Sequence, residues 1–163
     1  LSRYFKFEYF FLKILHQKPK KNEIQLLLDF YSSTVFEKLL KCRIAENLII
    51  FLEKYKNKKL MVVSGGNQDE LIKLFKKKNI YSYFNNSIFG SPKSKNKIFY
   101  EEIKKSKIIF PSIYIGDSKY DHQCSLENNI DFLFVSKWTE FKEWKKYCKI
   151  NSIPTVKKLS DLI

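Results

Sequence analysis

The chain has 163 residues, of which 44% are hydrophobic and 17% aromatic, and its formal net charge is +14. This length and composition predict one ordinary globular domain, or one core with a small appendage, and argue against a disordered chain. Only two of the 31 basic residues are arginine, the residue best suited to recognising bases and phosphates. We therefore interpret the positive charge as a solvated lysine surface and expect no nucleic-acid or membrane partner.

Two helical patterns open the chain, with apolar residues recurring on one face from Tyr4 to Ile14 and again from Ile24 to Leu39. They predict an antiparallel helical pair over residues 2–41. A third helix is predicted over residues 46–55, and it leads into the first strand.

From there strands and helices alternate along the chain. Strands are predicted at 60–64, 87–89, 112–115 and 132–135, with helices at 68–78, 96–105, 120–129 and 139–147. The tail, 155–163, is predicted as a last short strand or turn with a stub of helix. Alternation of this kind predicts a parallel sheet with helices on both faces, and the short, continuously apolar strands agree with it.

All four glycines follow predicted strands: Gly65 and Gly66 after the first, Gly90 after the second and Gly116 after the third. In open α/β sheets ligands bind at the carboxyl ends of the strands, and glycine lets the backbone turn tightly and approach a phosphate closely. We therefore expect the functional residues at these strand exits.

The third strand exit carries two carboxylates, Asp117 and Asp121, in the sequence Gly-Asp-Ser-Lys-Tyr-Asp. Carboxylates at a strand end and in the following helical turn converge, and such a pair suits Mg²⁺, which takes oxygen ligands. The alternative makes Asp117 a helix N-cap and Asp121 a favourable first-turn charge.

The other two exits offer groups that bind anions. Ser64, with the main-chain N–H groups of Gly65 and Gly66, precedes a predicted helix N-terminus, although a capped strand-to-helix turn explains the same residues. Lys93 precedes another helix and could neutralise charge on a transferring phosphoryl group, although a surface lysine is common in this chain.

Taken in order, these motifs resemble those of the haloacid-dehalogenase-like phosphatases, in the phosphoglycolate-phosphatase-like branch with a helical cap. Ser64 resembles the phosphate-binding serine of the second motif, and Lys93 fits the lysine of the third, with Lys95 a possible substitute because both prolines of that motif are replaced. Asp117 and Asp121 match the Mg²⁺-binding aspartates of the fourth motif.

The resemblance implies an α/β fold, a Rossmann-like parallel sheet with flanking helices plus a small helical cap. Residues 1–43 correspond to the cap, and Arg3 and Lys6 are candidates there for binding the remote end of the substrate. Residues 44–163 correspond to the core. The implied activity is Mg²⁺-dependent hydrolysis of a small phosphorylated metabolite through an aspartyl-phosphate.

One part of the family pattern is missing: no Asp-x-Asp occurs in the 163 residues. In the family this first motif ends the central strand and supplies the nucleophile, so we expect a sheet lacking that strand, a gap with two unpaired edges, and a fragment without turnover. A phosphomutase of the same superfamily and a non-catalytic, degenerate binding module remain as alternatives.

The sequence also bears on three further classes of protein. Cys42, Cys124 and Cys148 are widely spaced, which offers neither a disulfide framework nor a zinc site and favours a cytoplasmic protein. No apolar run reaches the roughly 18 residues that span a bilayer. A polyanion-binding basic protein, the remaining alternative, would bind DNA with an affinity that falls steeply with salt.

Overall fold

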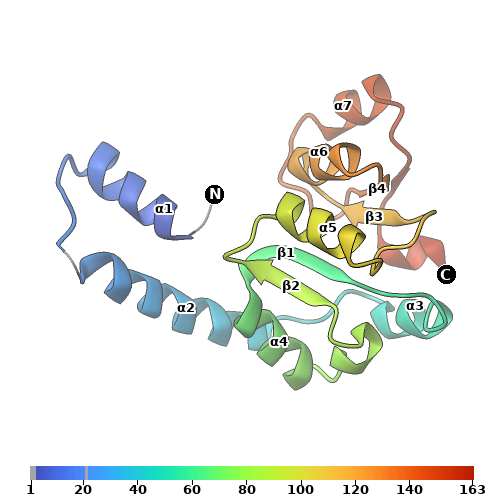
Figure 1. Ribbon diagram of the computed structural model, residues 1–163, viewed down its shortest axis with the longest axis horizontal. Coiled ribbons are helices and arrows are strands. Elements are labelled where there is room, and N and C mark those ends of the chain that lie inside the picture. The colour runs from blue at the N-terminus through green and yellow to red at the C-terminus, as the bar shows by residue number, and fades with distance from the viewer. Residues whose placement is uncertain (1–2, 21) are drawn as a thin grey trace.

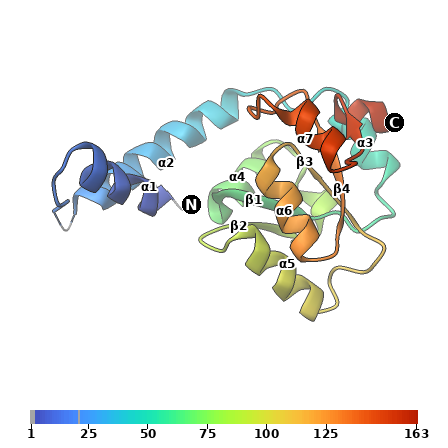
Figure 2. The same ribbon diagram turned by 90° about the horizontal axis from the view of Figure 1, so that it is seen from above.

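The computed structural model describes residues 3–20 and 22–163. A helical pair opens the chain and projects from the rest of the molecule in both views (Figures 1 and 2). Its first member is α1(Arg3–Tyr9), continued by the π-helical turn η1(Phe10–Ile14), and its second is the long helix α2(Glu23–Lys41). The predicted pair is therefore present, and residues 1, 2 and 21 of the predicted cap lie outside the described residues.

The remaining elements follow the predicted alternation of strands and helices. In chain order they are α3(Leu48–Lys54), β1(Val62–Asn67), α4(Gln68–Lys77), the 3-10 turn η2(Tyr81–Phe84), β2(Ile88–Ser91), α5(Lys95–Lys104), β3(Ile113–Gly116), α6(Lys119–Glu127), β4(Asp131–Val135), α7(Trp144–Ile150), β5(Thr155–Val156) and the 3-10 turn η3(Leu159–Leu162). The α/β class with parallel strands and flanking helices is confirmed.

Successive residues of β1 show how the helices cover both faces of the sheet, because side chains alternate along a strand. Val63 packs with Ile98 and Phe99 of α5 and with Cys124 of α6. Val62, the preceding residue, joins the apolar cluster of α3 and α4 around Leu52, Ile80, Phe84 and Ile88. Helices α3 and α4 therefore lie on one face and α5 and α6 on the other, as predicted.

The strands form two separate sheets. One contains β1 and β2, the other β3, β4 and β5, and all the pairings are parallel. In the described residues, no main-chain ladder joins β1 to β3, the two strands between which the sequence places the missing central strand. The expected interruption is therefore present.

Side chains bridge this interruption. The Tyr114 hydroxyl of β3 lies within hydrogen-bond distance of the carbonyl oxygen of Val63 in β1, at 3.2 Å, and the Tyr114 ring lies edge-on to Phe99 of α5. Because Val63 and Phe99 belong to one apolar cluster with Tyr114 packed against it, α5 and α6 hold the two sheets together.

The predicted start of the last helix is wrong. The last helix starts at Trp144 and not at Thr139, whose hydroxyl instead bonds the Asp117 carbonyl and the Phe141 N–H in the loop before the helix. Within the described residues, no helix combines the length and hydropathy needed to cross a membrane.

Candidate active site

Asp117 and Asp121 lie at the carboxyl end of β3, as the sequence predicts. β3 ends at Gly116, and Ser118 caps α6 by accepting a hydrogen bond from the Asp121 N–H at 3.1 Å. Gly116 is required here for space: a Cβ on it would lie 2.7 Å from the Asp121 Cβ. The described glycines all have negative φ, so an unusual backbone conformation does not explain their use. Close approach explains Gly116 and Gly90 only.

Asp121 is 3% exposed and its two carboxylate oxygens are fully engaged. Oδ1 accepts from the Tyr114 hydroxyl at 3.0 Å and from the Lys95 ammonium, while Oδ2 accepts from the Ser118 hydroxyl at 2.8 Å and, at 3.4 Å, from the Asp117 N–H. Burial opposes ionisation of Asp121, but the Lys95 charge and these hydrogen bonds outweigh it and lower the pKa of the carboxyl. Asp121 is therefore an ionised anchor with no free oxygen.

Asp117 differs from Asp121 in the hydrogen bonding and in the pKa of its carboxylate. Its main-chain N–H points to Asp121 and its carbonyl accepts a hydrogen bond from Thr139 Oγ1 at 2.5 Å, whereas its carboxylate receives none from another described side chain. Burial and the neighbouring Asp121 charge raise the pKa of Asp117. A cation beside Asp117 would relieve both effects, so this carboxylate is the group at the site that fits a hard metal ion.

The lysine beside the aspartates is Lys95, the substitute considered above, and not Lys93. The Lys95 ammonium bonds Asp121 and the Tyr114 hydroxyl, and its side chain is 16% exposed. Lys93 is instead 48% exposed and pairs with Glu101 of α5 at 2.5 Å. The reason is helical geometry: Lys95 begins α5, so its side chain faces the neighbouring α6, whereas Lys93 precedes the Ser94 cap.

Ser64, Gly65 and Gly66, called the Ser64 loop here, lie inside β1 and not after it as the sequence predicts, at an irregularity in the pairing of β1 with β2. They lie next to this cluster because the carbonyl of the preceding Val63 is the one bonded to Tyr114. The Ser64 hydroxyl accepts from the Gly66 N–H at 3.1 Å. Gly65 is exposed, and a Cβ on it would meet nothing within 4 Å. Helix α4 starts at Gln68 with an Asn67 cap, so its positive end faces these residues.

Gly90 permits the β1 and β2 exits to pack against each other. A Cβ on Gly90 would lie only 2.3 Å from the Gly66 carbonyl oxygen. The Gly90 N–H also donates to the side chain of Gln68 at 3.2 Å. These contacts fix the Ser64 loop relative to the segment that carries Lys95.

The two cap residues selected from the sequence are differently placed. Arg3 forms a bidentate pair with Glu70 of α4, at 2.8 and 3.0 Å, and donates to Ser32 of α2 at 3.1 Å. It therefore joins both helices of the projecting pair to the core. Lys6 is exposed on α1.

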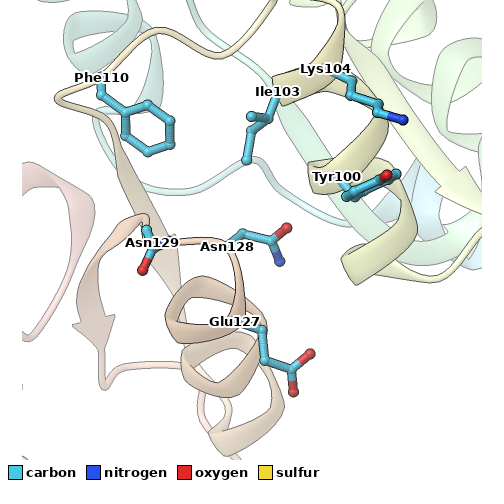
Figure 3. Close-up of a pocket in the computed structure, with 7 residues that line it drawn as sticks. All are labelled: Tyr100, Ile103, Lys104, Phe110, Glu127, Asn128 and Asn129. Carbon is cyan, nitrogen blue, oxygen red and sulfur yellow. The ribbon is translucent and has the colours of Figure 1, made fainter.

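One open cavity lies away from these residues (Figure 3). It has a volume of about 350 Å³ and lies between the C-terminal ends of α5 and α6, lined by Tyr100, Ile103, Lys104, Phe110, Glu127, Asn128 and Asn129. Since Asp121 is in the first turn of α6, this cavity lies at the far end of that helix. It contains none of the residues predicted for the site.

The described residues contain no group of three or more His, Cys, Asp and Glu side chains arranged to hold a metal ion. Asp117 alone is available, because Asp121 is occupied by its hydrogen-bond donors. Mg²⁺ commonly binds through one or two carboxylates and completes its shell with water and substrate oxygens. The donor set is therefore compatible with Mg²⁺ bound through Asp117.

The sequence did not point to Tyr114, Ser118 or Thr139, which support the aspartates. Ser118 could have been identified, because a serine three residues before an acidic residue at a helix start is a capping pattern. Tyr114 has the appearance of an ordinary strand residue, and Thr139 depends on a contact between two loops. Neither has a local signal.

The profile of the haloacid dehalogenase-like hydrolase family matches residues 5–135. The chain belongs to this family. The match includes the Ser64 loop, both lysines and both aspartates, but ends before Thr139. A comparison with curated protein sequences gave no significant match.

Solved structures of the same superfamily share the fold. A haloacid dehalogenase-like family hydrolase from Streptococcus pneumoniae superposes with a TM-score of 0.69 at 20% identity, covering 88% of this chain and 70% of that one. A HAD-superfamily hydrolase from Ehrlichia chaffeensis gives a TM-score of 0.55 at 17% identity, covering 98% of this chain and 83% of its own. At these identities the likeness concerns the fold.

Proposed function

We propose that this chain is part of a Mg²⁺-dependent phosphatase that hydrolyses a small phosphate monoester. The observation that carries the proposal is the meeting of Lys95, Asp117 and Asp121 at the carboxyl end of β3. The three residues combine a buried ion pair with an adjacent carboxylate that accepts no hydrogen bond from another described side chain. This combination offers both a cationic group for phosphate and a ligand for a hard cation.

Each group then has a distinct role. Asp117 holds the metal, and Asp121 lies behind it, fixing the loop and the Lys95 ammonium. When bound, Mg²⁺ supplies charge neutralisation for the phosphate. Lys95 adds a second positive charge, and the Ser64 loop, at the N-terminus of α4, binds phosphoryl oxygens through its hydroxyl and main-chain N–H groups.

The nucleophile is the missing part. The 163 residues contain no Asp-x-Asp, and the two sheets are interrupted between β1 and β3. The family resemblance places an aspartate-bearing strand there, so the attacking carboxylate has to come from residues outside this sequence. Without it no aspartyl-phosphate forms, and we expect the chain alone to show no phosphatase turnover.

The helical pair is assigned as the cap, residues 1–43, over a core of residues 44–163. Arg3 anchors this cap to α4 through Glu70, one turn beyond the Ser64 loop. Lys6, exposed on α1, remains the candidate for contacting the remote end of a substrate. Closure of a cap over the site is one way in which water is excluded and substrates are selected.

Two measurements test the proposal. Phosphate release from an aryl phosphate with Mg²⁺ is expected to be absent for the chain alone and present for a longer protein that includes an Asp-x-Asp strand. In that longer protein Asp117→Asn should abolish turnover without unfolding, whereas Lys93→Met, which alters an exposed lysine, should leave it nearly unchanged. Full activity of Asp117→Asn would overturn the metal assignment.

Two alternatives to a phosphatase, a phosphomutase and a non-catalytic binding module, can be distinguished by experiment. A phosphomutase would convert one sugar phosphate into its isomer instead of releasing phosphate. The absence of Asp-x-Asp favours a non-catalytic binding module if no longer protein exists. In that case the chain should bind inorganic phosphate in calorimetry without turnover in any form.

A further inference from the structure

We propose that Thr139 is a positioning residue for Asp117, holding the loop after β3 in the shape that presents the Asp117 carboxylate to a divalent cation. The proposal rests on the function proposed above, because it takes Asp117 as the metal-facing carboxylate. Thr139 lies outside the part of the chain that the family profile matches.

The Thr139 hydroxyl uses both its donor and its acceptor. It donates to the Asp117 carbonyl oxygen at 2.5 Å and accepts from the Phe141 N–H at 3.1 Å. One small side chain thus joins the loop after β3 to the loop after β4. β3 and β4 are parallel neighbours with Gly116 opposite Phe134, so these two loops leave the same edge of the sheet side by side.

The Asp117 main chain is therefore held on both sides, while its carboxylate accepts no hydrogen bond from another described side chain. On one side, its N–H lies 3.4 Å from Asp121 Oδ2, a long and weak hydrogen bond. On the other side, the bond from Thr139 to the carbonyl is short. The Thr139 bond is thus the shorter of the two contacts that fix the main chain of Asp117 beside Asp121.

The local structure around Thr139 supports this role. The sequence predicts a helix from Thr139, yet α7 begins only at Trp144, and the segment between β4 and α7 is instead a loop. A helix starting at Thr139 would give its hydroxyl different local partners and remove the bond to Asp117. The position of the loop is thus coupled to the contact with the candidate metal ligand.

The experiment compares Thr139→Val, which keeps the shape and removes the hydroxyl, with Thr139→Ser, which keeps the hydroxyl. Mn²⁺ binding to the intact 163-residue chain is followed by electron paramagnetic resonance, and amide hydrogen exchange is followed at Asp117, Ser118 and Lys119. We expect Thr139→Val to weaken Mn²⁺ binding about tenfold, the usual effect of losing a residue that supports a metal ligand. Exchange in the loop should rise about fivefold, as for one lost hydrogen bond.

Thr139→Ser should stay close to the unsubstituted chain in both measurements. Thermal unfolding of both variants identifies any general loss of structure, and the serine variant keeps the test valid if the valine variant folds poorly. Mn²⁺ binding that Thr139→Val leaves unchanged, or that Thr139→Ser weakens equally, overturns this proposal alone. Failure of the unsubstituted chain to bind Mn²⁺ overturns the metal assignment itself, and this proposal with it.

Discussion

Replacing Lys95 by Met removes the positive charge beside Asp121 and keeps most of the aliphatic stem. Both side chains of the pair are buried, at 16% and 4% exposed. Loss of one partner of a buried ion pair costs about 3–5 kcal/mol, and we expect about 3 because Tyr114 and Ser118 still donate to the stranded carboxylate. For a domain of this size that corresponds to a decrease in Tm of about 6–12 °C.

Urea and thermal unfolding at neutral pH measure this cost, and the matched control is Lys93→Met. That lysine belongs to the solvent-exposed pair with Glu101, so its loss should barely change the stability. The double variant Lys95→Met with Asp121→Asn should recover most of the lost stability, because no charge is left buried. Equal effects of Lys93→Met and Lys95→Met, or no recovery in the double variant, would refute the assignment of Lys95 as the buried partner.

Two further predictions concern space and protonation. Gly90→Ala should destabilise the protein by about 1–3 kcal/mol in urea unfolding, because its Cβ would lie 2.3 Å from the Gly66 carbonyl oxygen. Gly65→Ala is the control and should be nearly neutral, because its Cβ meets nothing within 4 Å. Burial lowers the pKa of His122, which bonds the Tyr147 hydroxyl at 2.9 Å, so the unfolded chain binds its proton more readily. The contribution of His122 to stability should be complete above about pH 6.5 and decline as the pH falls towards its folded pKa; a His122→Gln variant with the same decline would contradict this reasoning.

Local patterns were sufficient to predict much of the fold. The run of apolar residues around Val63 predicts β1, although β1 continues through the two glycines to Asn67 instead of ending before them. The spacing of Asp117 and Asp121 predicts a strand end followed by a helix, as observed. These signals succeed because they depend on neighbours in the sequence. The same is true of Ser118, whose capping bond spans three residues.

The residues that the sequence could not place depend on contacts between distant segments. The sequence favours Lys93 and leaves Lys95 as a substitute, whereas the structure places Lys95, at the start of α5, beside Asp121. The sequence makes Arg3 a candidate substrate residue because it is a cation in the predicted cap, and in the structure its guanidinium is bonded to Glu70, 67 positions away. Such pairings are set by packing, which no local pattern encodes.

The interruption between β1 and β3 explains why side chains, rather than a main-chain ladder, join the two halves of the site. Tyr114 reaches across it to the Val63 carbonyl, and the same hydroxyl contacts Lys95 and Asp121. Burial and the Asp121 charge raise the pKa of Tyr114, so its hydroxyl stays neutral. A neutral tyrosine hydroxyl has one proton, which it can donate to Val63 or to Asp121 but not to both. A strand entering between β1 and β3 would compete for the Val63 carbonyl and direct this proton to Asp121. A strand in that position would thereby strengthen the Asp121 anchor.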